Sequence, residues 1–318
     1  MADASIQTGN LSATQAANLA ALRDGERPPG DGGALAQELT EELELALAPI
    51  AGDRDPADAL WLFKSRLNDV HGCEQRFVDI VEEPFVPSIP LVRGRLVHKA
   101  IELSTTAKGD LAPGELVAEA AALMVSKDDD IADFVAALSV GERAELEAEA
   151  TSRVTAFADG FPPISKAWRP STEMSIRFEV LDGRVVLSAR PDLLLGHPEH
   201  DGKRGRVIVD LKTGATQRSH RDDLALYALV HTLALRIPPF RVATYYLETS
   251  RVDALDVTDD LLTAALRRVA DGATKVLALT TGQHEPTLNP GPACGWCARY
   301  DTCEGARRWD EERERRGL

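Results

Sequence analysis

Two short stretches, ARPDLLLG (Ala189–Gly196) and VIVDLKTG (Val207–Gly214), decide how this chain is read. The second is an aliphatic run that enters Asp210 and Lys212 and stops at a Thr-Gly pair, which is typical of a buried strand followed by a turn. Side chains two apart on a strand point to the same face, so Asp210 and Lys212 lie together. Asp192, in the first stretch, lies on a predicted strand as well. We therefore expect two carboxylates and a lysine at one edge of a small sheet.

This combination suits the hydrolysis of phosphodiesters. That reaction needs a cation on the scissile phosphate, an activated water and relief for the developing negative charge. The oxygens of Asp192 and Asp210 suit Mg²⁺ or Mn²⁺. The ammonium of Lys212 can polarise the water or hold the phosphate. A lone D-x-K triplet usually marks a solvated strand end, but the aliphatic strand and the upstream Pro-Asp favour catalysis.

The remaining elements are predicted from hydrophobic periodicity and turn residues. A helix from about residue 56 carries Leu60, Phe63, Leu67 and Val70 on one face and delivers Cys73. Residues 110–158 form a helical insert. The other expected elements are a second N-terminal helix (Ala34–Leu47) that stops near Pro49, a helix near Gly94 that contains His98, a hairpin of Met174–Val180 and Val185–Leu195, strands Arg206–Leu211 and Val242–Leu247, and helices Ser219–Leu235 and Thr258–Leu279.

The run "ARPDLLLG…VIVDLKTG" resembles the PD-(D/E)XK nucleases, in particular their RecB-like and AddB-like branch, over most of residues 60–305. The resemblance implies an α/β restriction-endonuclease-like core, in which helices flank a central mixed sheet. It implies that a metal is held by His98, Asp192, Asp210 and the backbone carbonyl of Leu211, and that Lys212 acts on the attacking water.

Three further positions match this branch. "GRLVH", ending at His98, resembles the helix that carries an additional metal ligand, and Glu173 resembles the acidic residue before the Pro-Asp motif. "DDLALY", ending at Tyr227, resembles the Q-x-x-x-Y element, although Asp223 stands where glutamine is usual. The alternatives are a packing role for His98 and Tyr227 and a plain strand-edge charge for Glu173, with Glu179 as a competing candidate.

The four cysteines form a second pattern. Cys73 stands alone before the expected core, and Cys294, Cys297 and Cys303 follow it within "CGWCARYDTC". Clustered cysteines in a reducing compartment bind metal or act in redox chemistry more often than they form disulfides. One cysteine before the core and three after it resemble the 4Fe-4S arrangement of the same branch, which would clasp both ends of the core. Zn²⁺ is the alternative at four thiolates.

Composition sets outer limits. The net charge of −15 argues against a protein that coats nucleic acid, but a local basic groove and catalytic metals leave a nuclease open. No apolar stretch is long enough to span a membrane, and Met1–Ser5 lacks the features of a signal peptide, so we expect a cytoplasmic protein. Residues 1–55 are expected to be peripheral, and 56–318 to form the nuclease domain with its insert at about 110–158 and its cysteines at 294–303.

The sequence thus predicts a metal-dependent deoxyribonuclease. We expect an exonuclease, or a nuclease of single-stranded or flapped DNA, that acts in repair or defence with a possible helicase or other partner. Two alternatives stay open: a non-catalytic DNA-binding or assembly module on a nuclease fold, and an RNA-processing nuclease. The presence of Asp192, Asp210 and Lys212 disfavours the non-catalytic module.

Overall fold

A computed structural model describes residues 11–26, 28, 31–82, 86–106, 109, 111–196 and 205–317. The chain divides into two compact units. The first contains Met1–Glu38, Val86–Ile176 and Ala189–Thr263, and the second contains Leu39–Phe85, Arg177–Ser188 and Ala264–Leu318. The predicted division at about residue 55 stays a prediction.

The first unit is built on a five-stranded mixed sheet in the order β2-β5-β6-β7-β8. β6 and β7 are parallel, whereas β2–β5, β5–β6 and β7–β8 are antiparallel pairs. Its elements are α1 (Ala13–Arg23), α5 (Ile89–Thr106), α6 (Pro113–Val125), α7 (Asp129–Ala137), α8 (Val140–Gly160), the 3-10 helix η3 (Lys166–Trp168), β2 (Ser171–Thr172), β5 (Leu193–Leu195), β6 (Val207–Lys212), α9 (Ser219–Leu235), β7 (Arg241–Tyr246) and β8 (Arg251–Asp256).

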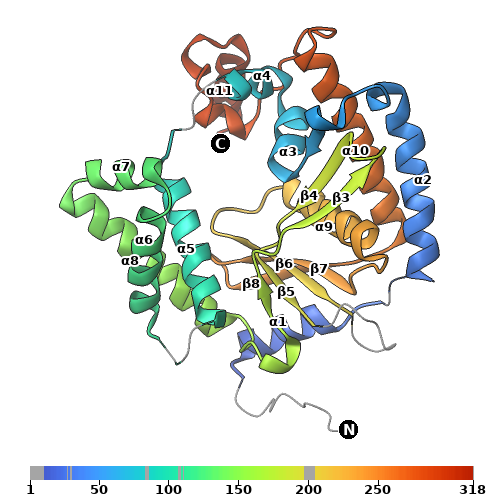
Figure 1. The fold of residues 1–318 in the computed structure, drawn as a ribbon. Helices are drawn as coiled ribbons and strands as arrows, with labels where there is room; N and C mark the ends of the chain where they lie inside the picture. The colour runs from blue at the N-terminus through green and yellow to red at the C-terminus, as the bar shows by residue number, and fades with distance from the viewer. Residues whose placement is uncertain are drawn as a thin grey trace. The chain divides into compact units, whose positions relative to one another are not determined.

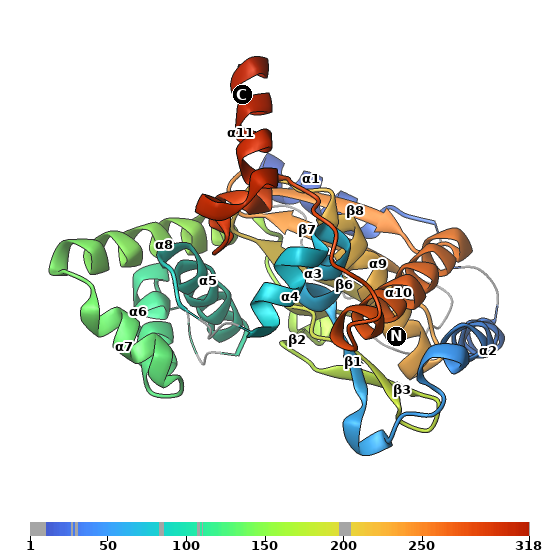
Figure 2. The same cartoon turned by 90° about the horizontal axis from the view of Figure 1, so that it is seen from above.

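Helices cover both faces of this sheet (Figure 1). Leu211 of β6 and Tyr245 of β7 share a buried core with α5, α6 and α8. The rings of Phe157 and Phe161 stack on each other, and both meet the Tyr245 ring edge-on. On the other face α9 lies against β6 and β7 (Figure 2). Both faces being covered explains why β6 reads as a continuous apolar run rather than as an alternating one.

The second unit contains a three-stranded sheet in the order β1-β4-β3. Its elements are η2 (Pro56–Asp58), β1 (Leu60–Leu62), α3 (Lys64–Gly72), α4 (Glu74–Glu82), β3 (Ile176–Val180), β4 (Val185–Ala189), η4 (Pro292–Trp296), η5 (Tyr300–Thr302) and α11 (Glu304–Arg316). Ile176 of β3 and Ala189 of β4 belong to the first unit. α2 (Gly32–Ala51) and α10 (Asp259–Thr280) contribute residues to both units.

The expected α/β class, with mixed sheet and flanking helices, is confirmed. The helical insert is present as α6, α7 and α8: α6 and α8 pack against α5, and α7 packs against α6 (Figures 1 and 2). The three helices expected near Gly94, at Ser219–Leu235 and at Thr258–Leu279 are found. α9 has the predicted bounds Ser219–Leu235, α10 is shifted from the prediction by one residue at each end, and α5 begins at Ile89, before Gly94.

Three local predictions were wrong. The helix expected from residue 56 begins only at Lys64, because Leu60–Leu62 pairs as parallel strand β1 with β4. α2 continues past Pro49 to Ala51 instead of stopping before it. The single strand expected over Val185–Leu195 is two strands in different sheets, β4 and β5, since Pro191 lacks the N–H that a continued ladder needs.

Candidate active site

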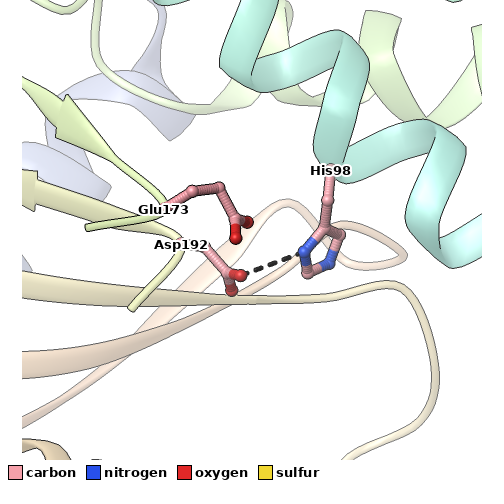
Figure 3. Close-up of side chains that lie close together, drawn as sticks. All are labelled: His98, Glu173 and Asp192. Carbon is pink, nitrogen blue, oxygen red and sulfur yellow. Dashed lines mark hydrogen bonds and ion pairs between the residues drawn. The ribbon is translucent and has the colours of Figure 1, made fainter. Parts of the chain in front are cut away.

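Three side chains from separate parts of the first unit gather at one point. His98 lies on α5, Glu173 follows β2, and Asp192 directly precedes β5. One ligand atom from each lies within 4.8 Å of those of the other two, and the close-up shows the three side chains pointing toward one another (Figure 3). One imidazole and two carboxylates form a donor set that fits a divalent cation such as Mn²⁺ or Mg²⁺.

Asp192 is the centre of this group. Its Oδ1 lies 3.0 Å from Nδ1 of His98, and its Oδ2 accepts a hydrogen bond of 2.6 Å from the backbone N–H of Leu211. The sheet sets this position, because β5 pairs with β6 in the register Leu193 to Val209, which brings Asp192 beside Asp210. The carboxylate is therefore fixed before any cation binds.

Glu173 is held in an uncommon backbone conformation. Its φ is 52°, in the left-handed region that non-glycine residues rarely adopt. Its N–H donates to the backbone carbonyl of Asp192 at 3.2 Å, and its Oε2 forms an ion pair with Arg190, 2.7 Å from Nε. Such strain persists where the surroundings enforce it, and it is concentrated at functional sites.

Charge is tuned within the group. Burial is the largest influence on His98 and disfavours its charged form, but the carboxylates of Asp192, Asp210 and Glu173 outweigh it and raise the pKa of His98 above its ordinary value. Burial, followed by repulsion from Asp192, raises the pKa of Glu173 against the pull of Arg190. The group is thus rich in negative charge that a bound cation would neutralise.

Lys212 and Asp210 lie on the α9 side of β6. Nζ of Lys212 is 2.8 Å from Oδ2 of Asp210 and 2.9 Å from Oδ2 of Asp223 on α9. Tyr227, one turn after Asp223, also belongs here: burial, then the charges of Asp210, Asp192 and Asp223, raise its pKa well above the ordinary value. Its hydroxyl remains a neutral hydrogen-bond donor, and it donates to the backbone carbonyl of Arg190 at 3.4 Å.

The structure brings three of the predicted site residues, His98, Glu173 and Asp192, into one compact group. Asp210 and Leu211, which were predicted as metal ligands, are not part of that group, and their role stays a prediction. Asp210 is paired with Lys212, and Leu211 contributes its N–H to Asp192. Arg190 and Asp223 were missed as site residues. Asp223 carried one signal, its place at the position of the usual glutamine.

The four cysteines line one cavity of about 370 Å³ in the second unit. They form no disulfide. Hydrogen bonds join the two chain segments that carry them: Glu74 accepts from the N–H and hydroxyl of Thr287, and Asn289 donates to the carbonyl of Gly72. Among the described residues, however, no three of the sulfur atoms lie within 4.8 Å of one another. The predicted compact set of sulfur ligands is therefore not formed in this structure.

Comparison with known proteins gives a family. The model of the PD-(D/E)XK nuclease superfamily matches residues 64–304. No curated protein matches the sequence. Among solved structures, the "Putative exonuclease" of Eubacterium rectale is 14% identical with a TM-score of 0.44, covering 79% of this chain and 88% of that one. SSO0001 is 10% identical with a TM-score of 0.31, covering 86% and 97%. In the described part of the chain, no helix has the length and apolar character of a membrane span.

Proposed function

The chain belongs to the PD-(D/E)XK nuclease superfamily, and from this membership we propose that it is a metal-dependent deoxyribonuclease. The observation that carries the proposal is the convergence of His98, Glu173 and Asp192 within 4.8 Å beside the D-x-K strand. A protein that keeps a nuclease fold but has lost catalysis does not need both a set of metal ligands and a buried lysine. A non-catalytic DNA-binding module is thus the weaker alternative.

His98, Glu173 and Asp192 would hold a Mg²⁺ or Mn²⁺ ion, and Asp210 would join them. Such a cation supplies Lewis acidity to the scissile phosphate and lowers the pKa of a bound water. The N–H of Leu211 keeps Asp192 oriented through the reaction. The backbone carbonyl of Leu211, predicted as a ligand from the resemblance, remains part of this proposal.

Lys212 would contact the attacking water and the phosphate. Its side chain is mostly buried between β6 and α9, with 17% of its surface exposed, so its ammonium is restricted in position. A positioned cation stabilises the negative charge that develops on the phosphate oxygens in the transition state. The hydroxyl of Tyr227 would stay neutral beside Asp210, since burial and the carboxylates around it oppose its ionisation.

We further propose that the substrate is single-stranded DNA or DNA with single-stranded ends, cut from an end or at a flap, in repair or defence and with a helicase or similar partner. An RNA-processing nuclease is the alternative, since the donor set does not discriminate a 2′-hydroxyl. Affinity that depends on phosphate contacts falls steeply with salt. A rate that does not change with salt would contradict such contacts.

The test is degradation of labelled single-stranded DNA in Mn²⁺ by anaerobically purified protein, with duplex DNA and RNA in parallel. Lys212→Ala is the control, because loss of one charge-stabilising donor typically lowers the rate by about 10²–10³. Cleavage that collapses in Lys212→Ala supports the nuclease, and the end from which label is lost gives its polarity. If the wild type cuts none of these substrates, the non-catalytic DNA-binding module becomes the preferred function.

The four cysteines would hold a 4Fe-4S cluster. Their donor set fits, and they share one cavity whose two segments are hydrogen-bonded together. Burial is the largest influence on Cys297 and raises the pKa of its thiol, an effect that a bound cation would oppose because it favours the thiolate. The sulfurs would have to move together on binding. Zn²⁺ is the alternative occupant.

A further inference from the structure

Lys212 is shared between two carboxylates that come from different elements. Asp210 lies two residues before it on β6, and Asp223 is on α9; their Oδ2 atoms lie 2.8 Å and 2.9 Å from Nζ. Asp210 is fully buried and Asp223 is 3% exposed. Two buried carboxylates thus share the ammonium of Lys212, and buried charges of this kind are costly unless they are paired and hydrogen-bonded.

The two carboxylates are not equivalent. Asp210 lies beside Asp192, at the edge of the metal-ligand group, and its charge raises the pKa of His98. Asp223 is held by a different element, α9, which is fixed by its packing on β6 and β7. A cation at His98 and Asp192 therefore competes with Lys212 for Asp210 alone.

This competition has a structural solution in the chain. An ammonium and a divalent cation both seek the oxygens of Asp210, and they repel each other at short range. Lys212 can release Asp210 at low cost only if another anion accepts its charge-assisted hydrogen bond. The carboxylate of Asp223 is already at hydrogen-bond distance.

We propose that Asp223 is a positioning residue that holds the ammonium of Lys212 while Asp210 turns toward the catalytic metal. The inference rests on the proposed function, because it requires a metal at His98 and Asp192. A neutral amide at residue 223 would accept a weaker hydrogen bond and would not balance the charge of Lys212. The carboxylate at the usual glutamine position therefore has a defined task in this chain.

The test is a double-mutant cycle read by Mn²⁺ binding in the absence of DNA, using electron paramagnetic resonance of the free ion. The variants are Asp223→Asn, Lys212→Ala and both together. Asp222→Asn, one position earlier on α9, controls for the change in charge. Asp192→Asn shows which part of the Mn²⁺ binding occurs at the site, because only that part is expected to be lost in this variant, whereas binding at other acidic positions of the chain is expected to remain.

With Lys212 present, Asp223→Asn is expected to lower the Mn²⁺ affinity about tenfold, because Lys212 then stays on Asp210. In the Lys212→Ala background the same change is expected to lower it less than about threefold. In turnover of labelled DNA, Asp223→Asn is expected to lower kcat while KM for DNA is retained, a split that a merely structural role would not produce.

Equal losses of Mn²⁺ affinity in the two backgrounds would overturn the inference, since Asp223 would then act only as one more charge near the metal. The absence of any loss in Asp223→Asn would overturn it as well. If the wild type shows no Mn²⁺ site that Asp192→Asn removes, the proposed function fails and the inference fails with it. Failure of the proposed function is distinguishable from failure of the inference alone. The first is measured by comparing only the wild type with Asp192→Asn, whereas the second requires the Asp223→Asn variants.

Discussion

The guanidinium of Arg190 lies against the carboxylate of Glu173, with Nε 2.7 Å from Oε2. Glu173 is also one of the three clustered metal-ligand candidates, so Arg190 pairs with a carboxylate that a metal ion would bind. The Arg190 side chain is 67% exposed and Glu173 is 24% exposed. The pair can therefore open toward solvent without disturbing the core.

From this pair we predict that Arg190→Gln raises the Mn²⁺ affinity of the DNA-free protein. Exposed ion pairs contribute up to about 1 kcal/mol, so the gain is at most about fivefold. Titration of Mn²⁺ by calorimetry measures it, with Arg153→Gln, which removes an arginine paired with Glu248, as the matched control. A lower affinity in Arg190→Gln would show instead that Arg190 is needed to hold Glu173 in position.

Asp192→Asn is expected to abolish Mn²⁺ binding at the site and to reduce DNA cleavage by more than about 100-fold, because loss of an outer partner of a ligand alone costs about 10–100-fold. The asparagine oxygen can still accept from the N–H of Leu211, so the fold is expected to be retained. Metal titration, cleavage assays and thermal unfolding of the same preparation measure the three effects. Retained cleavage would exclude Asp192 as a ligand.

His231 predicts a pH dependence of stability that is independent of the site. It is fully buried on α9, its Nδ1–H donates to the carbonyl of Ile237 at 3.0 Å, and its Nε2 has no hydrogen-bond partner among the residues that the structure describes. Burial lowers its pKa from 6.5 to about 4. The folded state thus holds the neutral ring, and its contribution is complete above pH 6.5 and is lost as the pH falls toward 4.

The loss is of the order of 3 kcal/mol in the free energy of unfolding, from the difference between the two pKa values. Urea unfolding of the wild type between neutral pH and pH 4 measures it. His231→Asn keeps a donor for Ile237 but cannot be protonated in this range, so its stability is expected to change less over the same interval. Identical pH profiles for the two proteins would contradict a buried neutral His231.

Cys297→Ala tests the cysteine cavity. If a 4Fe-4S cluster joins the two segments, this variant is expected to lose the brown colour, the bound iron and part of its thermal stability. Metal analysis of anaerobically purified protein gives the identity of the ion. Zinc in the wild-type protein would show that the cysteines form a zinc site instead of holding a cluster. A metal-free wild type, together with an unchanged melting curve in Cys297→Ala, would exclude both.

Much of the site is local and was predictable from the sequence. The strand that carries Asp210 and Lys212, the helix that carries His98 and the helix Ser219–Leu235 follow from hydrophobic periodicity, which reflects the side that each element buries. Because residues two apart on a strand share a face, Asp210 and Lys212 were placed together correctly. The family resemblance added Glu173, which no periodicity identifies.

Only the tertiary structure decided which of these groups meet. The break at Pro191 sends β4 and β5 into different sheets, and the register of β5 on β6 brings Asp192 to the N–H of Leu211. The packing of α9 on the sheet places Asp223 against Lys212. Such pairings depend on register and helix packing between distant segments, and a one-residue shift would turn each side chain to another face. The local pattern thus determined the elements and the chemical groups they carry, whereas long-range packing determined the charge pairs that make a site of them.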